Sequence, residues 1–235
     1  MLLAIDTATA HASLALDDGA EILAEHNWLC ANNHTVELAP QVEHMLRTAG
    51  VRADSLEALA VALGPGSFTG LRIGLAFAKG FSLAYALPLV GVPTLDIVAY
   101  GQPKRDGVLF AVISAGRGRI SARAYRWREV GWQADGPAYI TDWDRLLRGL
   151  ETENVYVCGE IDAVARNAVG ERVIFAPPPM NVRRGAYLIA IARHRLASGQ
   201  TDDPSVLAPL YLRTPEGGEQ SPKVAEHSAS HAQST

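Results

Sequence analysis

Cysteine is scarce in this chain, and its two cysteines lie far apart. Cys30 and Cys158 belong to no CxxC pair and to no zinc-type pattern of cysteines and histidines. Structural zinc sites and disulfide frameworks depend on such spacings. We therefore expect both residues to be reduced, ordinary thiols.

Long apolar runs and an excess of positive charge are also lacking. No uninterrupted apolar segment approaches the roughly 20 residues of a membrane span. The N-terminus, MLLAIDTATA, has no basic region and reaches Asp6 almost at once, unlike a signal peptide. The net charge is −4, whereas a protein that grips nucleic acid by itself needs clustered Lys and Arg. We expect a cytosolic protein with at most local basic patches.

The first half of the chain alternates short strands and amphipathic helices. A chain of 235 residues can form one large domain or two of about a hundred residues each. The order strand, strand, strand, helix, strand, helix, strand indicates an α/β fold. The expected strands are 2–5, 11–16, 22–28, 58–63 and 89–92, and the expected helices are 35–49 and 69–87.

The second half resembles a reduced copy of the first. Strands are expected at 108–114, 120–127, 155–158 and 173–175, with helices at 142–150, from about 162, and at 184–198. The segment GQPKRDG at 101–107 separates the halves. We predict a first lobe over 1–102, a smaller lobe over 103–213, and a disordered tail over 214–235, which lacks large apolar residues.

The stretch Leu63 to Leu87 combines a glycine loop with one long helix. Glycines let the backbone turn sharply out of a strand, and Ser67 or Thr69 can cap the helix. A helical projection predicts one face packed on the sheet, made of Gly70, Ile73, Gly74, Phe77, Phe81 and Ala84. The opposite face is also apolar, so the helix needs two partners, and the second could be another chain.

Several segments resemble the bacterial TsaB family, also called YeaZ. They are GPGSFTGLRIG (64–74), AKG (78–80), PLVGV (88–92), IDTATAHASLAL (5–16), NHTVELAP (33–40) and DPSVLAPLYLR (203–213). TsaB proteins are non-catalytic paralogues of the TsaD/Kae1/Gcp enzymes. The resemblance implies a two-lobed actin-like ATPase fold, ribonuclease-H-like in its first lobe, with a reduced second lobe.

The resemblance also implies a role in a complex. TsaD, the ATPase TsaE and a TsaB-like chain make threonylcarbamoyladenosine at position 37 of tRNAs that read ANN codons, using ATP, L-threonine and bicarbonate. This chain would bind no cofactor catalytically and would offer a docking surface, in a heterodimer with TsaD or in a competing homodimer. We predict a four-helix interface, two helices from each subunit, to which this chain contributes Leu38, Gln41, Met45, Arg72, Leu75, Ala76, Lys79 and Leu83.

Three loops stand where nucleotide-binding members of this superfamily hold phosphate, metal and adenosine. Asp6, Thr7 and Thr9 follow the first strand, and they could contact phosphate or simply satisfy turn backbone groups. Related TsaB sequences have Asp-Ala-Arg in the second loop, where this chain has Ser114-Ala115-Gly116-Arg117. The third loop, 158–162, has one glycine and two acids, which suits a purine and phosphates poorly.

The metal-binding histidine pair of TsaD relatives is absent from its expected place. The segment GVPTLDIVA puts Thr94 and Val98 at those two positions, so no metal site is expected. His34 is the obvious substitute, but it has no second histidine at helical spacing, and we favour a surface or interface role for it.

Two other functions remain as alternatives. The first is an active enzyme of the same fold, either an ATP-using phosphotransferase or a metal-dependent, glycoprotease-like peptidase. Ser67 lies outside a G-x-S-x-G motif, which argues against a serine hydrolase. The second is a stand-alone RNA-binding module, although a solvated strand face is favoured over it. Its cations would be Arg117, Arg119, Arg123, Arg126 and Arg128.

Overall fold

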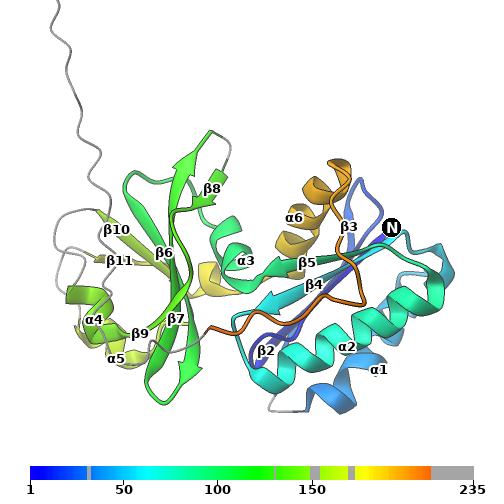
Figure 1. Ribbon diagram of the computed structural model, residues 1–235, viewed down its shortest axis with the longest axis horizontal. Coiled ribbons are helices and arrows are strands. Elements are labelled where there is room, and N and C mark those ends of the chain that lie inside the picture. Colours follow the sequence, from blue (N-terminus) through cyan, green and yellow to red (C-terminus); the bar gives the residue numbers. More distant parts are fainter. Residues whose placement is uncertain (31–32, 130, 149–153, 169–172, 213–235) are drawn as a thin grey trace, which may run out of the picture.

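The computed structural model describes residues 1–30, 33–129, 131–148, 154–168 and 173–212. Two β-sheets stand side by side, and the chain passes from one to the other and back again (Figure 1). The predicted tail at 214–235 lies outside the described residues.

The first sheet has five strands in the order β3-β2-β1-β4-β5. β1 pairs antiparallel with β2, Leu3 opposite Leu16, and parallel with β4, Leu3 opposite Leu59. The expected order of strands and helices in this lobe is confirmed. The strands are β1 Leu2–Asp6, β2 His11–Asp17, β3 Ile22–Leu29, β4 Ala58–Gly64 and β5 Leu89–Pro93, and a 3₁₀ turn η1 spans Ala53–Ser55.

The second sheet repeats this order with β8-β7-β6-β10-β11, and β9 pairs with β7. As in the first sheet, an antiparallel hairpin is continued by parallel strands. The prediction of a reduced copy is therefore confirmed. Its elements are β6 Val108–Gly116, β7 Arg119–Arg128, β8 Gly131–Ala134, β9 Tyr139–Asp142, α4 Trp143–Arg148, β10 Val155–Gly159, α5 Ala163–Ala168, β11 Val173–Phe175 and the 3₁₀ turn η2 Pro178–Asn181.

Helices cover both faces of the first sheet. α1 (His34–Thr48) and α2 (Phe68–Tyr85) pack on one face, and α6 (Gly185–Ala197) packs on the other (Figure 1). The prediction that residues 103–213 all belong to the second lobe is wrong for the last part of the chain. Leu188 and Ala192 of α6 join the core of the first sheet, because the apolar backs of β1 and β4 need a cover.

The segment after α6 also returns to the first sheet. The amide nitrogen of Asp202 donates to the carbonyl of Leu89 at 2.8 Å, and that of Leu210 donates to the carbonyl of Leu63 at 2.7 Å. Arg72 donates a hydrogen bond to the hydroxyl of Tyr211 at 3.0 Å. The C-terminal part of the described chain is thus a strap across the first lobe.

One helix between the lobes escaped the sequence analysis. α3 (Thr94–Tyr100) follows β5 directly. Its Leu95 and Val98 pack against the second sheet, whereas its Ile97 packs against the first. α3 therefore joins the two lobes through an apolar contact.

The glycine loop and the first turn of α2 have the expected geometry. Gly64 has a φ of +109°, and the Ser67 hydroxyl caps the helix by accepting from the amide of Gly70. A Cβ on Gly70 would clash with the carbonyl oxygen of Thr7, and one on Gly74 would clash with the Thr7 hydroxyl. These two glycines let α2 approach the end of β1, as predicted.

The predicted faces of α2 are rotated from the observed ones. Leu71, Leu75 and Ala78 point inward, and Leu75 is only 5 % exposed. The prediction that Leu75 faces outward is wrong. The sheet and α1 together supply the two apolar partners that this helix needs, within one chain, and Phe77 and Phe81 are half-buried against the same core.

Two interface predictions on α1 are wrong for the same reason. Leu38 and Met45 are 2 % and 4 % exposed and belong to the core between α1 and the sheet. Gln41 is half-buried, and Val36 is a large apolar side chain that this helix exposes. Leu38 and Met45 are both buried because they lie on the side of α1 that faces the sheet.

No helix among the described residues is long and apolar enough to cross a membrane.

Candidate functional site between the lobes

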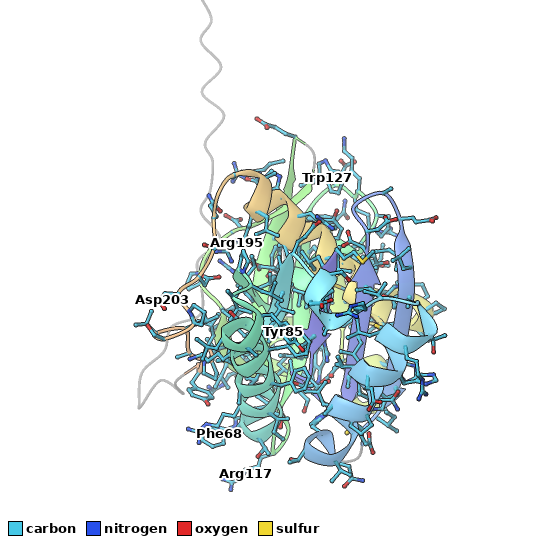
Figure 2. The ribbon with its side chains drawn as sticks, turned by 90° about the vertical axis from the view of Figure 1, so that its right-hand side faces the viewer. Phe68, Tyr85, Arg117, Trp127, Arg195 and Asp203 are labelled. Atoms are coloured by element: carbon cyan, nitrogen blue, oxygen red, sulfur yellow. The ribbon has the colours of Figure 1, made fainter. Side chains whose placement is uncertain are left out.

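A cleft of about 1200 Å³ lies between the lobes. Its walls come from the turn after β1, the start of α2, the β6–β7 hairpin, the end of β10 and the C-terminal strap. Figure 2 labels Phe68 at the start of α2 and Arg117 on the β6–β7 hairpin, which belong to opposite walls of the cleft. The cleft thus gathers all three loops that the resemblance associates with nucleotide binding.

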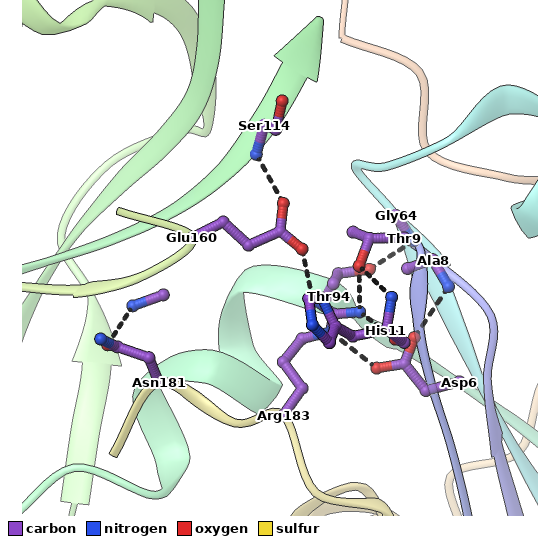
Figure 3. Close-up of polar contacts among 11 residues, drawn as sticks. Asp6, Ala8, Thr9, His11, Gly64, Thr94, Ser114, Glu160, Asn181 and Arg183 are labelled. Atoms are coloured by element: carbon purple, nitrogen blue, oxygen red, sulfur yellow. Dashed lines mark hydrogen bonds and ion pairs between the residues drawn. The ribbon is translucent and has the colours of Figure 1, made fainter. Parts of the chain in front are cut away.

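Arg183 lies at the inner end of the cleft and is the centre of a polar network (Figure 3). Its Nε donates to Asp6 Oδ2 at 2.9 Å, and its Nη1 donates to Glu160 Oε1 at 3.1 Å. Its Nη2 donates to Thr9 Oγ1 and to the carbonyl of His11, both at 2.8 Å. The Arg183 side chain is only 3 % exposed, so these oxygens replace water around its charge.

The residues predicted to contact phosphate are buried and already hydrogen-bonded. Asp6 accepts from Arg183 and, through its other oxygen, from the amide of Ala8 at 2.8 Å. The Thr7 hydroxyl donates to the carbonyl of Gly70 at 2.8 Å. Of the two interpretations left open for this turn, the geometry favours satisfied turn groups over phosphate contact.

The other two loops meet through Glu160. One carboxylate oxygen of Glu160 binds Arg183, and the other accepts from the amide of Ser114 at 3.0 Å. Asn181 fixes the same turn by accepting from the amide of Gly159 at 2.9 Å. The predicted second phosphate loop and adenosine loop are therefore tied to each other and to the end of β1.

The charges of the network stabilise one another. Burial disfavours the charge on Arg183, but Asp6 and Glu160 outweigh it and raise the pKa of the guanidinium. Burial would likewise raise the pKa of Glu160, yet Arg183 and the hydrogen bonds of its neighbours lower it. Two carboxylates around one cation leave a net negative site. A nucleotide phosphate and its metal do not fit these residues, since phosphate would be repelled and a metal would compete with Arg183.

The positions of the missing histidine pair are part of the protein core. Thr94 is fully buried and its hydroxyl accepts from the amide of Gly64 at 3.0 Å. Val98 is 4 % exposed and packs in the core of the second lobe. Within the described part of the chain, no three side chains of His, Cys, Asp or Glu are grouped to hold a metal ion.

His34 does not lie at the surface, contrary to expectation. It is 5 % exposed, and its ring lies beside Gly70 where the first turns of α1 and α2 meet. Its Nδ1 is buried without a hydrogen-bond partner, and burial lowers the pKa of the imidazole. The ring is therefore a neutral packing element between the two helices.

The predicted basic patch is divided. Successive residues of a strand point to opposite faces, so Arg119 and Arg123 share one face of β7, and Arg126 and Arg128 the other. Arg123 pairs with Asp96 at 3.2 Å, and Arg126 pairs with Asp135 at 2.7 Å. These pairs leave fewer cations for phosphate than the sequence suggested.

Arg183 itself was missed by the sequence analysis. It lies 177 residues from Asp6 and 23 residues from Glu160, in a loop with no recognisable motif. Two consecutive arginines before a helix are a weak signal, because the adjacent Arg184 is half-exposed and contacts only its own lobe, through Glu25 and the ring of Tyr187.

Comparison with known proteins gives a consistent result. Residues 28–201 match a family model described as "TsaD: tRNA N6-adenosine threonylcarbamoyltransferase". The chain is 39 % identical to the tRNA threonylcarbamoyladenosine biosynthesis protein TsaB of Escherichia coli, over 90 % of this chain and 94 % of that protein. It is 29 % identical to the protein of the same name from Bacillus subtilis, over 92 % and 95 %.

The fold has a counterpart among solved structures. YeaZ from Pseudomonas aeruginosa superposes with a TM-score of 0.73 at 22 % identity, covering 90 % of this chain and 99 % of that one. The structure thus shares the fold, and the extent of the sequence matches shows that the chain belongs to the TsaB family of tRNA threonylcarbamoyladenosine biosynthesis proteins.

Proposed function

We propose that this chain is a non-catalytic subunit that works with TsaD and TsaE in forming threonylcarbamoyladenosine at position 37 of tRNAs that read ANN codons. ATP, L-threonine and bicarbonate are then handled by the complex. The chain's own contribution is a docking surface, and it works in the cytoplasm.

The absence of a suitable catalytic centre among the described residues supports this role. Thr94 and Val98 are core residues at the places where TsaD relatives are expected to bind metal. Asp6, the carboxylate at the end of β1, is paired with Arg183. An enzyme of this fold would need both places free for substrate or metal.

The docking surface is narrower than the sequence predicted. Leu83 is 75 % exposed and Arg72 and Ala76 are exposed on α2, whereas Lys79 and Gln41 are half-exposed. Val36 of α1 is 74 % exposed. Exposed aliphatic side chains on two adjacent helices are the observation that carries the proposal, because burying them favours association at about 25 cal/mol per Å² before association costs.

A co-purification experiment with TsaD tests the surface. Leu83→Glu should abolish co-elution while the monomer keeps its melting temperature, because the new charge would be buried only in the complex. Val206→Glu is a matched control, since Val206 is also 75 % exposed but lies on the C-terminal strap. Co-elution of Leu83→Glu with TsaD at wild-type strength would contradict the proposed surface.

Two measurements on the purified chain address the alternatives. If the purified chain alone hydrolyses ATP or contains a stoichiometric metal ion, the chain is an enzyme and the proposal of a non-catalytic subunit is wrong. A salt-dependent tRNA mobility shift without TsaD would favour an RNA-binding module. A shift seen only in the mixture with TsaD would support the proposed subunit.

A further inference from the structure

The Arg183 guanidinium donates hydrogen bonds to four oxygen atoms. They belong to the carboxylates of Asp6 and Glu160, the hydroxyl of Thr9 and the carbonyl of His11. Carboxylate, hydroxyl and carbonyl oxygens are also the ligands that hard divalent cations take in proteins. The guanidinium therefore occupies a pocket whose chemistry is that of a cation site.

These oxygens come from both lobes. Asp6, Thr9 and His11 lie at the end of β1 and the start of β2 in the first lobe, and Glu160 follows β10 in the second lobe (Figure 3). Arg183 stands in the segment that returns the chain from the second lobe to α6. One buried side chain thus joins three parts of the chain across the inner end of the cleft.

The neighbouring arginine shows what this placement adds. Arg184 binds Glu25 of β3, and its side chain is 48 % exposed. That pair links two elements of the first lobe and leaves the second lobe untouched. Arg183 differs from it in burial and in reaching Glu160.

We propose that Arg183 is a built-in cation that takes the place of a bound metal ion at the inner end of the cleft and pins the two lobes at one separation. The guanidinium offsets one of the two carboxylate charges, occupies the position that a divalent cation would take between them, and contacts both lobes at once through its fork. α3 joins the lobes through apolar packing, and Arg183 supplements this packing with hydrogen-bonded ion pairs to both lobes. The oxygen atoms that could bind a metal ion there are thereby already occupied, whether or not the chain acts with TsaD.

The charge attraction between Arg183 and the second lobe can be removed without exposing the buried arginine. Glu160→Gln keeps the side-chain shape and leaves Arg183 paired with Asp6. Spin labels at Glu43→Cys on α1 and Gln133→Cys on β8 report the distance between the lobes, since both positions are exposed and the native Cys30 and Cys158 are buried. Double electron–electron resonance spectroscopy should give a narrow distribution of distances between the labels in the chain that carries no other change. The same labels in the Glu160→Gln variant should give a broadened or shifted distribution.

The matched control is Glu25→Gln, which removes the partner of Arg184 inside the first lobe. It should leave the distance distribution unchanged. If Glu160→Gln and the otherwise unchanged labelled chain give identical distance distributions, the proposal that Arg183 fixes the separation of the lobes is wrong.

A second measurement tests the vacated cation site. Arg183→Ala should bind Mn²⁺ at millimolar concentration, seen as loss of the free-ion signal in electron paramagnetic resonance, whereas the unchanged chain and Arg184→Ala should not. If the unchanged chain binds Mn²⁺ equally well, or if folded Arg183→Ala binds none, the proposal that Arg183 takes the place of a metal ion is wrong. If Arg183→Ala does not fold, the Glu160→Gln distances decide the proposal. Both measurements use the chain without TsaD, so their failure is distinct from failure of the scaffold role.

Discussion

The inner and outer faces of α2 carry the same residue types in opposite environments. Leu75 is 5 % exposed in the core of the first lobe, whereas Leu83 on the same helix is 75 % exposed. Gly74 lies against Thr7, where a Cβ would clash, whereas nothing lies within 4 Å of a Cβ built on Gly80. The helix that passes between Phe68 and Tyr85 in Figure 2 thus has a structural side and a free side.

This comparison shows that residue type alone does not reveal a docking surface. A helix that is apolar all round can satisfy two neighbours of its own chain, here the sheet and α1. Only the apolar residues left after both contacts are available to a partner. On α2, Leu83 meets that condition and Leu75 does not.

The largest expected effect comes from truncating the buried leucine. Leu75→Ala should lower the free energy of unfolding by about 2–5 kcal/mol, because it removes buried methyl groups and leaves a cavity. Leu83→Ala should change it by less than about 0.5 kcal/mol, as is usual for surface substitutions. Urea denaturation of both variants gives the two values, and equal losses would mean that the two faces are not distinct.

Adding a methyl group tests the same two faces in the opposite direction. Gly74→Ala should destabilise the protein by about 1–3 kcal/mol, because the Cβ forces α2 away from Thr7. Gly80→Ala should stabilise it by about 1 kcal/mol, since alanine favours a helix and the site is open. A thermal melt of each variant should therefore shift in opposite directions, and a shared direction would refute the close contact.

A smaller, pH-dependent effect should come from His34, which packs where α1 meets α2. Burial lowers its pKa from the ordinary value of 6.5, so the unfolded chain binds a proton at a pH where the folded chain does not. The contribution to stability is complete above about pH 6.5 and is lost as pH falls from there to the folded pKa. Denaturation curves between pH 8 and 5 should show a weaker pH dependence for His34→Gln than for the unchanged chain. Identical slopes for the two would contradict a neutral buried imidazole.

The succession of elements could be predicted from the sequence because it depends on local patterns. The apolar strands and the capped helix after Gly66 lie in short windows of sequence, and the structure confirms them. α3 was missed because it has only seven residues and follows β5 directly, with no loop between them. Helix caps and turns depend on neighbouring residues, whereas α3 is stabilised by packing against both lobes, which its own sequence does not reveal.

The site was harder to predict, for the opposite reason. Asp6 and Thr9 were recognised as a polar turn after the first strand, but their partner Arg183 comes from the far end of the chain. Without that partner the turn could equally have faced phosphate. The orientation of α2 was misjudged because its apolar residues surround the helix, and no projection of the sequence alone distinguishes the side that meets α1.

The sequence by itself determined the α/β class, the duplicated strand order, the packing of Gly70 and Gly74 toward the sheet and the resemblance to TsaB, since each of these depends on neighbouring residues or on recognisable segments. Only the tertiary structure decided that Leu38, Met45 and Leu75 are core residues. It also decided that α6 belongs to the first lobe and that Arg183 lies between Asp6 and Glu160 at the inner end of the cleft. Burial and ion pairing depend on which distant segments the folded chain brings within a few ångströms, and no local pattern contains that distance.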